Sequence, residues 1–281
     1  LEELTLSKAV IPQSELEFLL GETDLEVLQA FVEYAHFLSE DQKLNTAKHL
    51  LKNPHPQIQK QVCSLMHGLT LDADLLKLVL AKISTCADPV LMTKLIPNLQ
   101  SQLPLIPLAY FEPLVRHPNP EVQAACLEIL KESPAARFRP LFQDCIQSKE
   151  PRVRSNALVG LWRLGEPIIL QVLETDPEGQ FITTHLHALG ETGQDPAIQK
   201  LLVSYLDHVN PQIASQAALS LGKTGNQSHI QDLLLRALHL GSGFCKAAFV
   251  RGALMISEGE TARTLSNLSE IFYQNQEFDN Y

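Results

Sequence analysis

Glycine, aromatic residues and positive charge are all scarce in this chain. Glycine supplies only 13 of the 281 residues and aromatic side chains only 6%, whereas 45% of the residues are hydrophobic. The hydrophobic share is too high for a disordered chain. The shortage of glycine disfavours a β fold, because such folds need many tight turns.

Basic residues are outnumbered by acidic ones, 22 against 32, which gives a formal net charge of −10. Nucleic acids and anionic membranes attract basic proteins, so we expect neither as a general partner. No apolar run approaches the roughly 20 residues that span a bilayer, so we expect no direct membrane insertion. The charge is uneven: residues 1–41 hold ten acidic side chains and one lysine, whereas residues 131–163 hold seven basic and three acidic ones.

The chain also lacks paired-cysteine motifs. Its five cysteines are an odd number and none forms a CxxC pair, so a zinc ribbon or a thioredoxin motif is not available. The simplest interpretation is reduced thiols in a reducing compartment, which predicts a cytoplasmic location. The chain begins at Leu1 without a signal-peptide pattern, and we expect it to be part of a longer polypeptide.

A repeated pattern accounts for most of the sequence. Residues 153–165, 181–193 and 213–225 align so that, counting from a first apolar residue as position 0, positions 4, 5 and 8 are mostly apolar or small. The same template fits five further segments at intervals of 28–33 residues. The eight positions 0 are Val27, Ile58, Leu91, Val122, Val153, Phe181, Ile213 and Cys245. Positions 0, 4, 5 and 8 lie on one stripe of an α-helix, so each segment predicts an amphipathic helix.

Proline marks the start of five of these helices, two residues before position 0, where its missing N–H costs nothing. These prolines are Pro56, Pro89, Pro120, Pro151 and Pro211. Further apolar stretches lie between the helices, so each repeat is predicted to be a pair of antiparallel helices. One such pair cannot bury both apolar sides, but stacked pairs share a continuous core.

The sequence therefore predicts an all-α fold, an α-solenoid of about eight stacked helical hairpins that forms one domain over residues 1–281. A C-terminal capping helix and an acidic tail are expected at 258–281. The predicted repeats are 1–39, 40–70, 71–103, 104–133, 134–165, 166–193, 194–225 and 226–257.

The run from Pro151 to Leu161, Pro-Arg-Val-Arg-Ser-Asn-Ala-Leu-Val-Gly-Leu, resembles the second-helix signature of HEAT repeats. The repeat length resembles the short bacterial form of that family, which is also found in phycobilin-lyase-like proteins. The resemblance covers nearly the whole chain. It implies a superhelix in which the second helices of the repeats line the concave side.

Positions 2, 6 and 9 lie opposite the apolar stripe and are therefore expected on that concave side. Apolar side chains surrounded by basic ones are typical of binding hot spots, and Trp162 is the only tryptophan. The alternative is that Trp162 packs on a neighbouring repeat. The predicted partner-binding residues are Trp162, Val159, Arg163, Lys131, Glu128, Ser155, His187 and Leu219.

Motifs for catalysis are missing. The sequence has no Gly-rich phosphate loop, no Ser-His-Asp set and no GxSxG elbow. It also has no His-Glu dipeptide, the pair with which the HEAT-like enzyme deoxyhypusine hydroxylase holds its two irons. We therefore predict no catalytic residues, no metal and no cofactor. His185 stands at a core position and is predicted to be a core histidine rather than a ligand.

The function predicted on these grounds is a non-catalytic scaffold or adaptor, monomeric, whose concave face binds a protein or another domain of the same polypeptide. A phycobilin-lyase-like or chaperone-like role on a cofactor-bearing partner is the alternative. A HEAT-like DNA glycosylase is a weaker alternative, because a net charge of −10 opposes the binding of duplex DNA.

Overall fold

The computed structural model describes residues 11–133, 135–175, 179, 181–241 and 243–257. These residues form sixteen α-helices and two 3₁₀ segments, and no β-strand occurs among them. The predicted all-α class is therefore confirmed. The chain divides into two compact units, residues 1–141 and 142–281.

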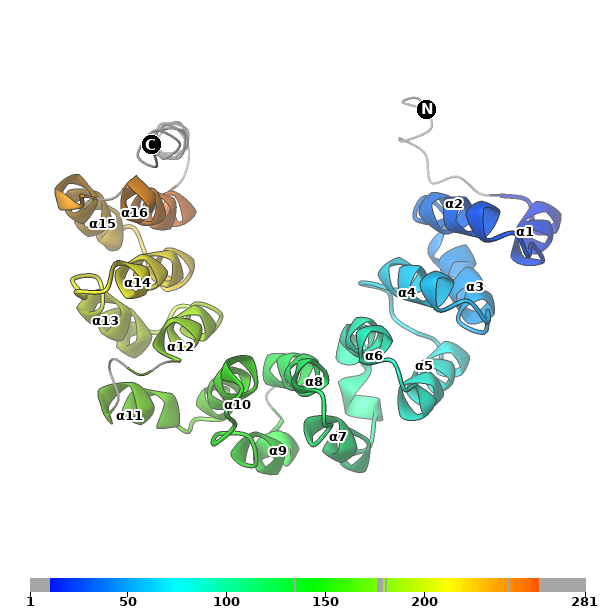
Figure 1. Cartoon of the computed structure of the whole chain (residues 1–281), viewed down its shortest axis with the longest axis horizontal. Helices are drawn as coiled ribbons and strands as arrows, with labels where there is room; N and C mark the ends of the chain where they lie inside the picture. Colours follow the sequence, from blue (N-terminus) through cyan, green and yellow to red (C-terminus); the bar gives the residue numbers. More distant parts are fainter. Residues whose placement is uncertain (1–10, 134, 176–178, 180, 242, 258–281) are drawn as a thin grey trace. The chain divides into compact units, whose positions relative to one another are not determined.

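In the first unit the helices form two rows (Figure 1). Helices α2, α4, α6 and α8 contact one another in succession, and α1, α3 and α5 do the same in the other row. The elements are α1 (Gln13–Leu20), α2 (Leu25–Ala35), α3 (Glu40–Leu50), α4 (Pro56–Leu65), α5 (Ala73–Thr85), α6 (Pro89–Leu95), η2 (Ile96–Leu105), α7 (Leu108–Val115), α8 (Pro120–Glu132), η3 (Ala136–Phe138) and α9 (Arg139–Gln143), which contains the boundary between the units.

The second unit repeats this arrangement. Helices α10, α12, α14 and α16 contact one another in succession. Helices α13 and α15 pack on α14 and α16 of their own repeats, whereas α11 packs on α10 of the preceding repeat. The elements are α10 (Pro151–Arg163), α11 (Ile168–Thr175), α12 (Ile182–Leu189), α13 (Pro196–Ser204), α14 (Pro211–Thr224), α15 (Ser228–His239) and α16 (Gly243–Ile256).

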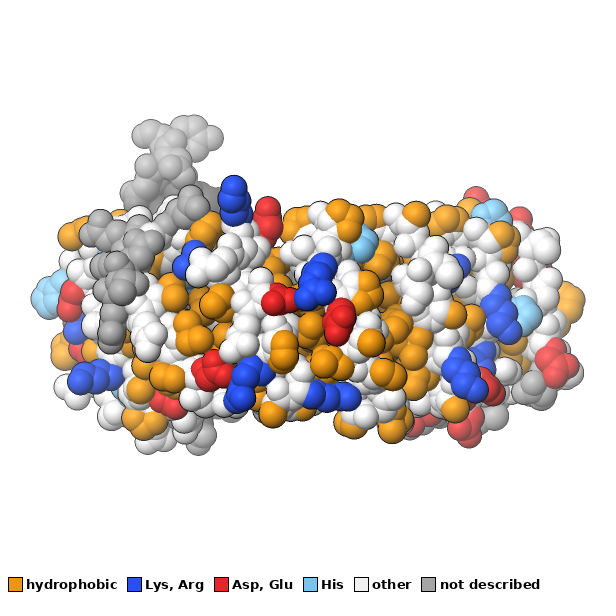
Figure 2. Space-filling model, turned by 90° about the horizontal axis from the view of Figure 1, so that it is seen from below, with side chains coloured by type: hydrophobic (Ala, Val, Ile, Leu, Met, Phe, Trp, Pro, Cys, Tyr) orange, Lys and Arg blue, Asp and Glu red, His pale blue; other side chains and the backbone are white. Residues whose placement is uncertain are grey.

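Each of the eight ranges expected to be a repeat contains two α-helices, and the fold of stacked hairpins is an α-solenoid. The capping helix and acidic tail expected at 258–281 lie outside the described residues. One domain over the whole chain stays a prediction. Among the helices of the described ranges, none is both long and apolar enough to cross a membrane. On the face seen in Figure 2, basic side chains lie interspersed with acidic and hydrophobic ones.

The turn that precedes each proline-started helix has a recurring hydrogen bond. Five residues before position 0, a side chain accepts a hydrogen bond from the backbone N–H two residues later, over 2.9–3.3 Å. The accepting atoms belong to Asn53, Cys86, His117, Ser148 and His208. An imidazole can accept only through an unprotonated nitrogen, so Nδ1 carries no proton in His117 and His208. Different residue types thus make the same turn.

Ion pairs connect neighbouring repeats in the first unit. Lys48 lies 2.6 Å from Asp72, and Lys60 lies 2.7 Å from Asp88. Each aspartate also caps the N-terminus of the helix that follows it, α5 or α6. The hydrogen bond from the lysine is the main cause that holds the pKa of both carboxyls below their usual value. Both pairs are partly exposed, so they fix the register of the stack more than its stability.

The buried stripe agrees with the template except at position 0 of two repeats, where Phe181 is half-buried and Val27 is exposed. Position 0 is at most 4% exposed in Ile58, Leu91, Val122, Val153, Ile213 and Cys245. Val27, however, is 42% exposed, whereas its neighbour Leu28 is fully buried. Phe31, Val32 and Ala35 at positions 4, 5 and 8 are buried as predicted, so the exception in α2 is confined to position 0. His185 is 4% exposed, so its predicted place in the core is confirmed.

Helices α14 and α16 approach each other through glycine. A Cβ atom added to Gly222 would lie 2.6 Å from the Cα of Gly252, and one added to Gly252 would collide with the backbone oxygen of Ala218. Such distances leave no room for a side chain. The two helices consequently pack backbone to backbone along this stretch.

We expect Gly252→Ala to lower the free energy of unfolding by about 1–3 kcal/mol, because the new methyl group overpacks the contact with Ala218. In an open helix the same change is stabilising by up to about 1 kcal/mol. Gly21→Ala is the control, since a Cβ there would meet nothing closer than 3.5 Å. Urea denaturation of both variants measures the difference, and equal stabilities would contradict the close packing of α14 on α16.

The turn hydrogen bond provides a second test. His208→Leu removes the acceptor for the N–H of Asn210 and should cost about 1 kcal/mol of stability. His208→Asn should retain most of it, because asparagine makes this bond at Asn53. Thermal unfolding of the two variants checks the expectation. Equal losses in both would show that the ring packing on Tyr205, and not the hydrogen bond, is what matters.

Candidate partner-binding surface

The structure separates the predicted partner-binding residues into exposed and buried ones. His187 and Glu128 are exposed, and Trp162, Arg163 and Leu219 are half-buried. The remaining three, Val159, Ser155 and Lys131, are buried. Glu128 and Lys131 belong to the first unit and the other six to the second. The expected set therefore does not form one exposed surface.

Val159 was expected to point away from the core, and this expectation is wrong. Its side chain is fully buried and belongs to the hydrophobic cluster of the second unit. Helix α10 is contacted both by α11 of the next repeat and by α12. Two neighbours cover more of a helix than the single apolar stripe that the template assumed, so position 6 of this repeat is enclosed.

Ser155 and Lys131 were also expected on the open side, and they are only 2% and 6% exposed. Ser155 stands at position 2, which is buried in other repeats too, as Ala124, Ser215 and Ala247. Small side chains at this position let the adjacent helix come close. Lys131 stands at position 9, where Gly190 and Gly222 are buried. Positions 2 and 9 therefore serve helix packing in these repeats.

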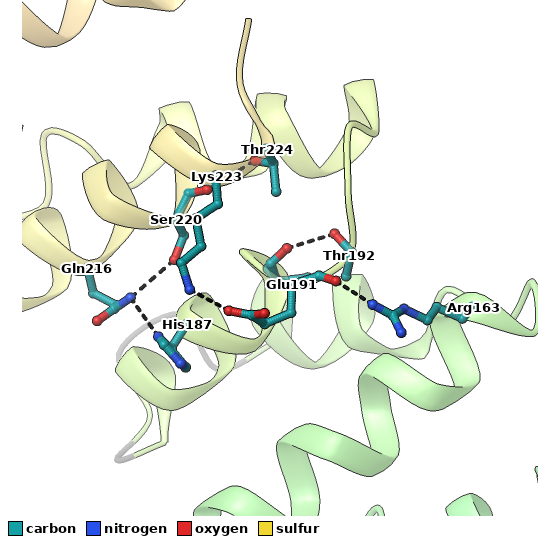
Figure 3. A network of polar contacts seen from close by, with 9 residues as sticks. Arg163, His187, Glu191, Thr192, Gln216, Ser220, Lys223 and Thr224 are labelled. Carbon is teal, nitrogen blue, oxygen red and sulfur yellow. Dashed lines mark hydrogen bonds and ion pairs between the residues drawn. The ribbon is translucent and has the colours of Figure 1, made fainter. Parts of the chain in front are cut away.

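A row of polar side chains follows the exposed edge of α10, α12 and α14 (Figure 3). Arg163 donates a hydrogen bond to the backbone oxygen of Glu191, and the Glu191 carboxylate pairs with Lys223. These contacts join three successive repeats, and each residue stands at position 10 of its repeat. We call Arg163, His187, Glu191, Gln216 and Lys223 the polar edge.

His187 and Gln216 extend the polar edge along α12 and α14. The Gln216 amide nitrogen lies 3.4 Å from His187 Nδ1 and donates to the hydroxyl of Ser220 over 3.1 Å. An amide NH₂ group only donates, so Nδ1 of the neutral ring is the acceptor and Nε2 carries the proton. The exposed side of the imidazole is consequently a hydrogen-bond donor.

Leu219 lies between residues of the polar edge. Gln216, Leu219 and Lys223 are spaced three and four residues apart on α14, so they share one side of the helix. An apolar side chain between two polar ones, each held by contacts to the neighbouring repeat, is the arrangement of a small binding surface. Trp162 lies next to Arg163 and packs partly against the hydrophobic cluster, as the alternative expectation proposed.

Sequence reasoning missed Glu191, Gln216 and Lys223. A signal for two of them exists, because position 10 reads Arg163, Glu191 and Lys223 in three successive repeats, which alternate in charge. Opposite charges at equivalent positions of adjacent repeats predict ion pairs across the stack. Position 10 lies outside positions 2, 6 and 9, which are the positions at which the open side is predicted.

The described residues offer little reactive chemistry. Burial raises the pKa of the Cys63 thiol to about 12, so it stays protonated at neutral pH and is a poor nucleophile. Within the ranges that the structure describes, no three side chains of His, Cys, Asp or Glu are grouped to hold a metal ion. The polar edge can donate and accept hydrogen bonds, and that suits recognition.

Comparison with known families identifies HEAT repeats in residues 109–179, about a quarter of the chain. The matched residues run from α7 to the end of α11 and so include α10, the helix whose sequence resembled the HEAT signature. HEAT repeats typically mediate protein interactions, and the comparison supports a HEAT-repeat family. The comparison with curated proteins finds no match.

The half-buried position of Trp162 predicts an intermediate effect on stability. Trp162→Ala should lower the free energy of unfolding by about 1–3 kcal/mol, less than the roughly 3–5 kcal/mol of a fully buried tryptophan. His187→Ala, which removes an exposed side chain, should change it by less than about 0.5 kcal/mol. Chemical denaturation compares the two variants. A loss above about 3 kcal/mol for Trp162→Ala would assign this residue to packing alone.

Proposed function

We propose that this chain is a non-catalytic HEAT-type scaffold and that the polar edge, with Leu219 and Trp162, binds a protein partner or a neighbouring domain of the same polypeptide. The observation that carries the proposal is the row of exposed and half-buried polar side chains that contacts between repeats fix along α10, α12 and α14. The HEAT repeats in residues 109–179 support it, because repeats of this kind are typical of interaction scaffolds.

The side chains of the polar edge are already held in place in the free protein, and this favours binding. Immobilising a long side chain at an interface costs about 0.5–1.5 kcal/mol, and a side chain that is already fixed avoids this cost. Arg163, Gln216 and Lys223 are fixed in this way by contacts with the adjacent repeat. A partner therefore meets a surface whose donors already point in defined directions.

The chemistry of the polar edge indicates the kind of partner segment that it binds. Lys223 and Arg163 supply positive charge, His187 supplies a donor through Nε2, and Leu219 supplies apolar area. A complementary segment would carry an apolar side chain for Leu219 beside carboxylates or carbonyl oxygens. The charges would mainly speed the encounter, and the apolar contact would hold the complex.

We further propose that the scaffold acts as a monomer in the cytoplasm. The five cysteines form no disulfide, which agrees with a reducing compartment.

Substitution of Leu219 tests the proposed surface. Affinity capture with the wild-type chain, Leu219→Asp and Val209→Asp should retain the same partner with wild type and with Val209→Asp, and lose it with Leu219→Asp. Val209 is the matched control, because it is 89% exposed and lies on the loop before α14, away from the polar edge. We expect Leu219→Asp to weaken binding at least tenfold, which corresponds to about 1.4 kcal/mol.

Two results would contradict the proposal. Retention of the partner by Leu219→Asp at wild-type affinity would place the binding surface elsewhere. A spectral shift of an added tetrapyrrole that the wild-type chain causes and Leu219→Asp leaves unchanged would favour the lyase-like alternative. Circular dichroism of each variant confirms that the helices are intact.

A further inference from the structure

Helix α2 exposes positions that later repeats bury. Position 7 is at most 7% exposed in Leu65, Asn98, Ile129, Ala188 and Ser220. In the first repeat this position is Tyr34, which is 37% exposed, and position 0 is Val27, which is 42% exposed. The first repeat thus presents an open apolar side where later repeats are closed.

The contacts in the second unit show what normally covers this side. Position 7 of the last repeat is Gly252, which lies against the backbone of Ala218 on the helix of the preceding repeat. In the seventh repeat position 7 is Ser220, and it lies against Gly190 of the sixth repeat. Position 7 therefore belongs to the side on which the second helix of the preceding repeat packs. Position 0 stands seven residues earlier, about two helical turns, and so lies on the same side. Among the described residues α2 is the first helix of its row, and α4 is the helix of that row that contacts it (Figure 1).

Aromatic side chains enlarge the open side. Phe37 is 46% exposed, and its ring centroid lies 6.3 Å from that of Tyr34. Val27 and Tyr34 lie seven residues apart on α2, about two turns or roughly 10 Å along the helix, and Phe37 lies in the turn that follows the helix. We call Val27, Tyr34 and Phe37 the α2 stripe.

The α2 stripe has an acidic border. Glu26 and Glu33 are exposed and stand one residue before Val27 and Tyr34, which places them along the edge of the stripe that faces away from the core. Residues 11–42 contain no lysine or arginine. A helix that covers the stripe would therefore meet negative charge on its flank.

From these observations we propose that the α2 stripe is a docking site for an amphipathic helix of a partner, with an apolar side flanked by lysines or arginines. The later repeats show the kind of occupant that fits, because there a helix packs on the side of the second helix that corresponds to Val27 and Tyr34. The negative charge along the stripe favours a partner helix with basic flanks, because lysines or arginines there would pair with Glu26 and Glu33. This site lies in the first unit and does not depend on the polar edge.

A designed peptide tests the proposal directly. The probe is a synthetic helix of about 18 residues with leucines along one side and lysines on both flanks, and its partner probe has glutamates in place of the lysines. Fluorescence anisotropy with the whole chain should show binding of the lysine peptide, weakened by added salt. The glutamate peptide should bind at least tenfold more weakly.

Substitutions separate the apolar contact from simple charge attraction. Tyr34→Asp should weaken binding of the lysine peptide at least tenfold, although it adds a negative charge. Val90→Asp is the control, because it adds the same charge at an exposed position elsewhere in the first unit. Val90 lies on α6 and is 52% exposed, and the variant should bind the lysine peptide like the wild type. Circular dichroism and thermal unfolding show whether each variant retains its helices.

Three results would overturn the proposal. Wild-type affinity in Tyr34→Asp, or equal binding of the two peptides, would remove the α2 stripe as the site. A concentration-dependent dimer of the wild-type chain that Tyr34→Asp abolishes would identify a second copy as the occupant. A tenfold gain in peptide affinity after deletion of residues 1–10 would show that the chain covers the stripe itself.

Discussion

The burial of one repeat against the next is the interaction on which this structure depends. A pair of short helices exposes apolar residues on two sides, and only stacking removes both from water. The contact of Gly222 with Gly252 is a close approach of this kind on α14 and α16, because no room is left there for a side chain between the two backbones.

Polar contacts determine how the repeats join. A buried or partly buried backbone oxygen between repeats needs a donor, and side chains from the neighbouring repeat supply it. Tyr110 donates to the carbonyl of Leu80, Tyr205 to that of Leu173, and Gln102 to that of Leu71. These partners are 30 to 32 residues apart, about one repeat. The spacing between repeats thus appears in the hydrogen bonds as well as in the sequence.

The two proposed surfaces arise from the same constraint in different ways. The polar edge lies where stacking leaves the ends of α10, α12 and α14 open to solvent, and contacts between repeats fix its side chains. In the α2 stripe, Val27 and Tyr34 stand at positions that most later repeats bury, and they are exposed on the first helix that the structure describes in this row. One surface is suited to a hydrogen-bonding partner, and the other to a helix that continues the packing.

The sequence alone determined the helical hairpins, their number in the described residues and the starts at Pro56, Pro89, Pro120, Pro151 and Pro211, because helix periodicity and proline act within one segment of chain. It also placed His185 in the core. It did not determine which other sides of a helix are covered. Val159 and Ser155 lie off the apolar stripe and are nevertheless buried, whereas Val27 lies on it and is exposed. Only the tertiary structure decides this, because exposure depends on how many neighbouring helices contact each one, and a periodic pattern reports only the side facing the nearest core.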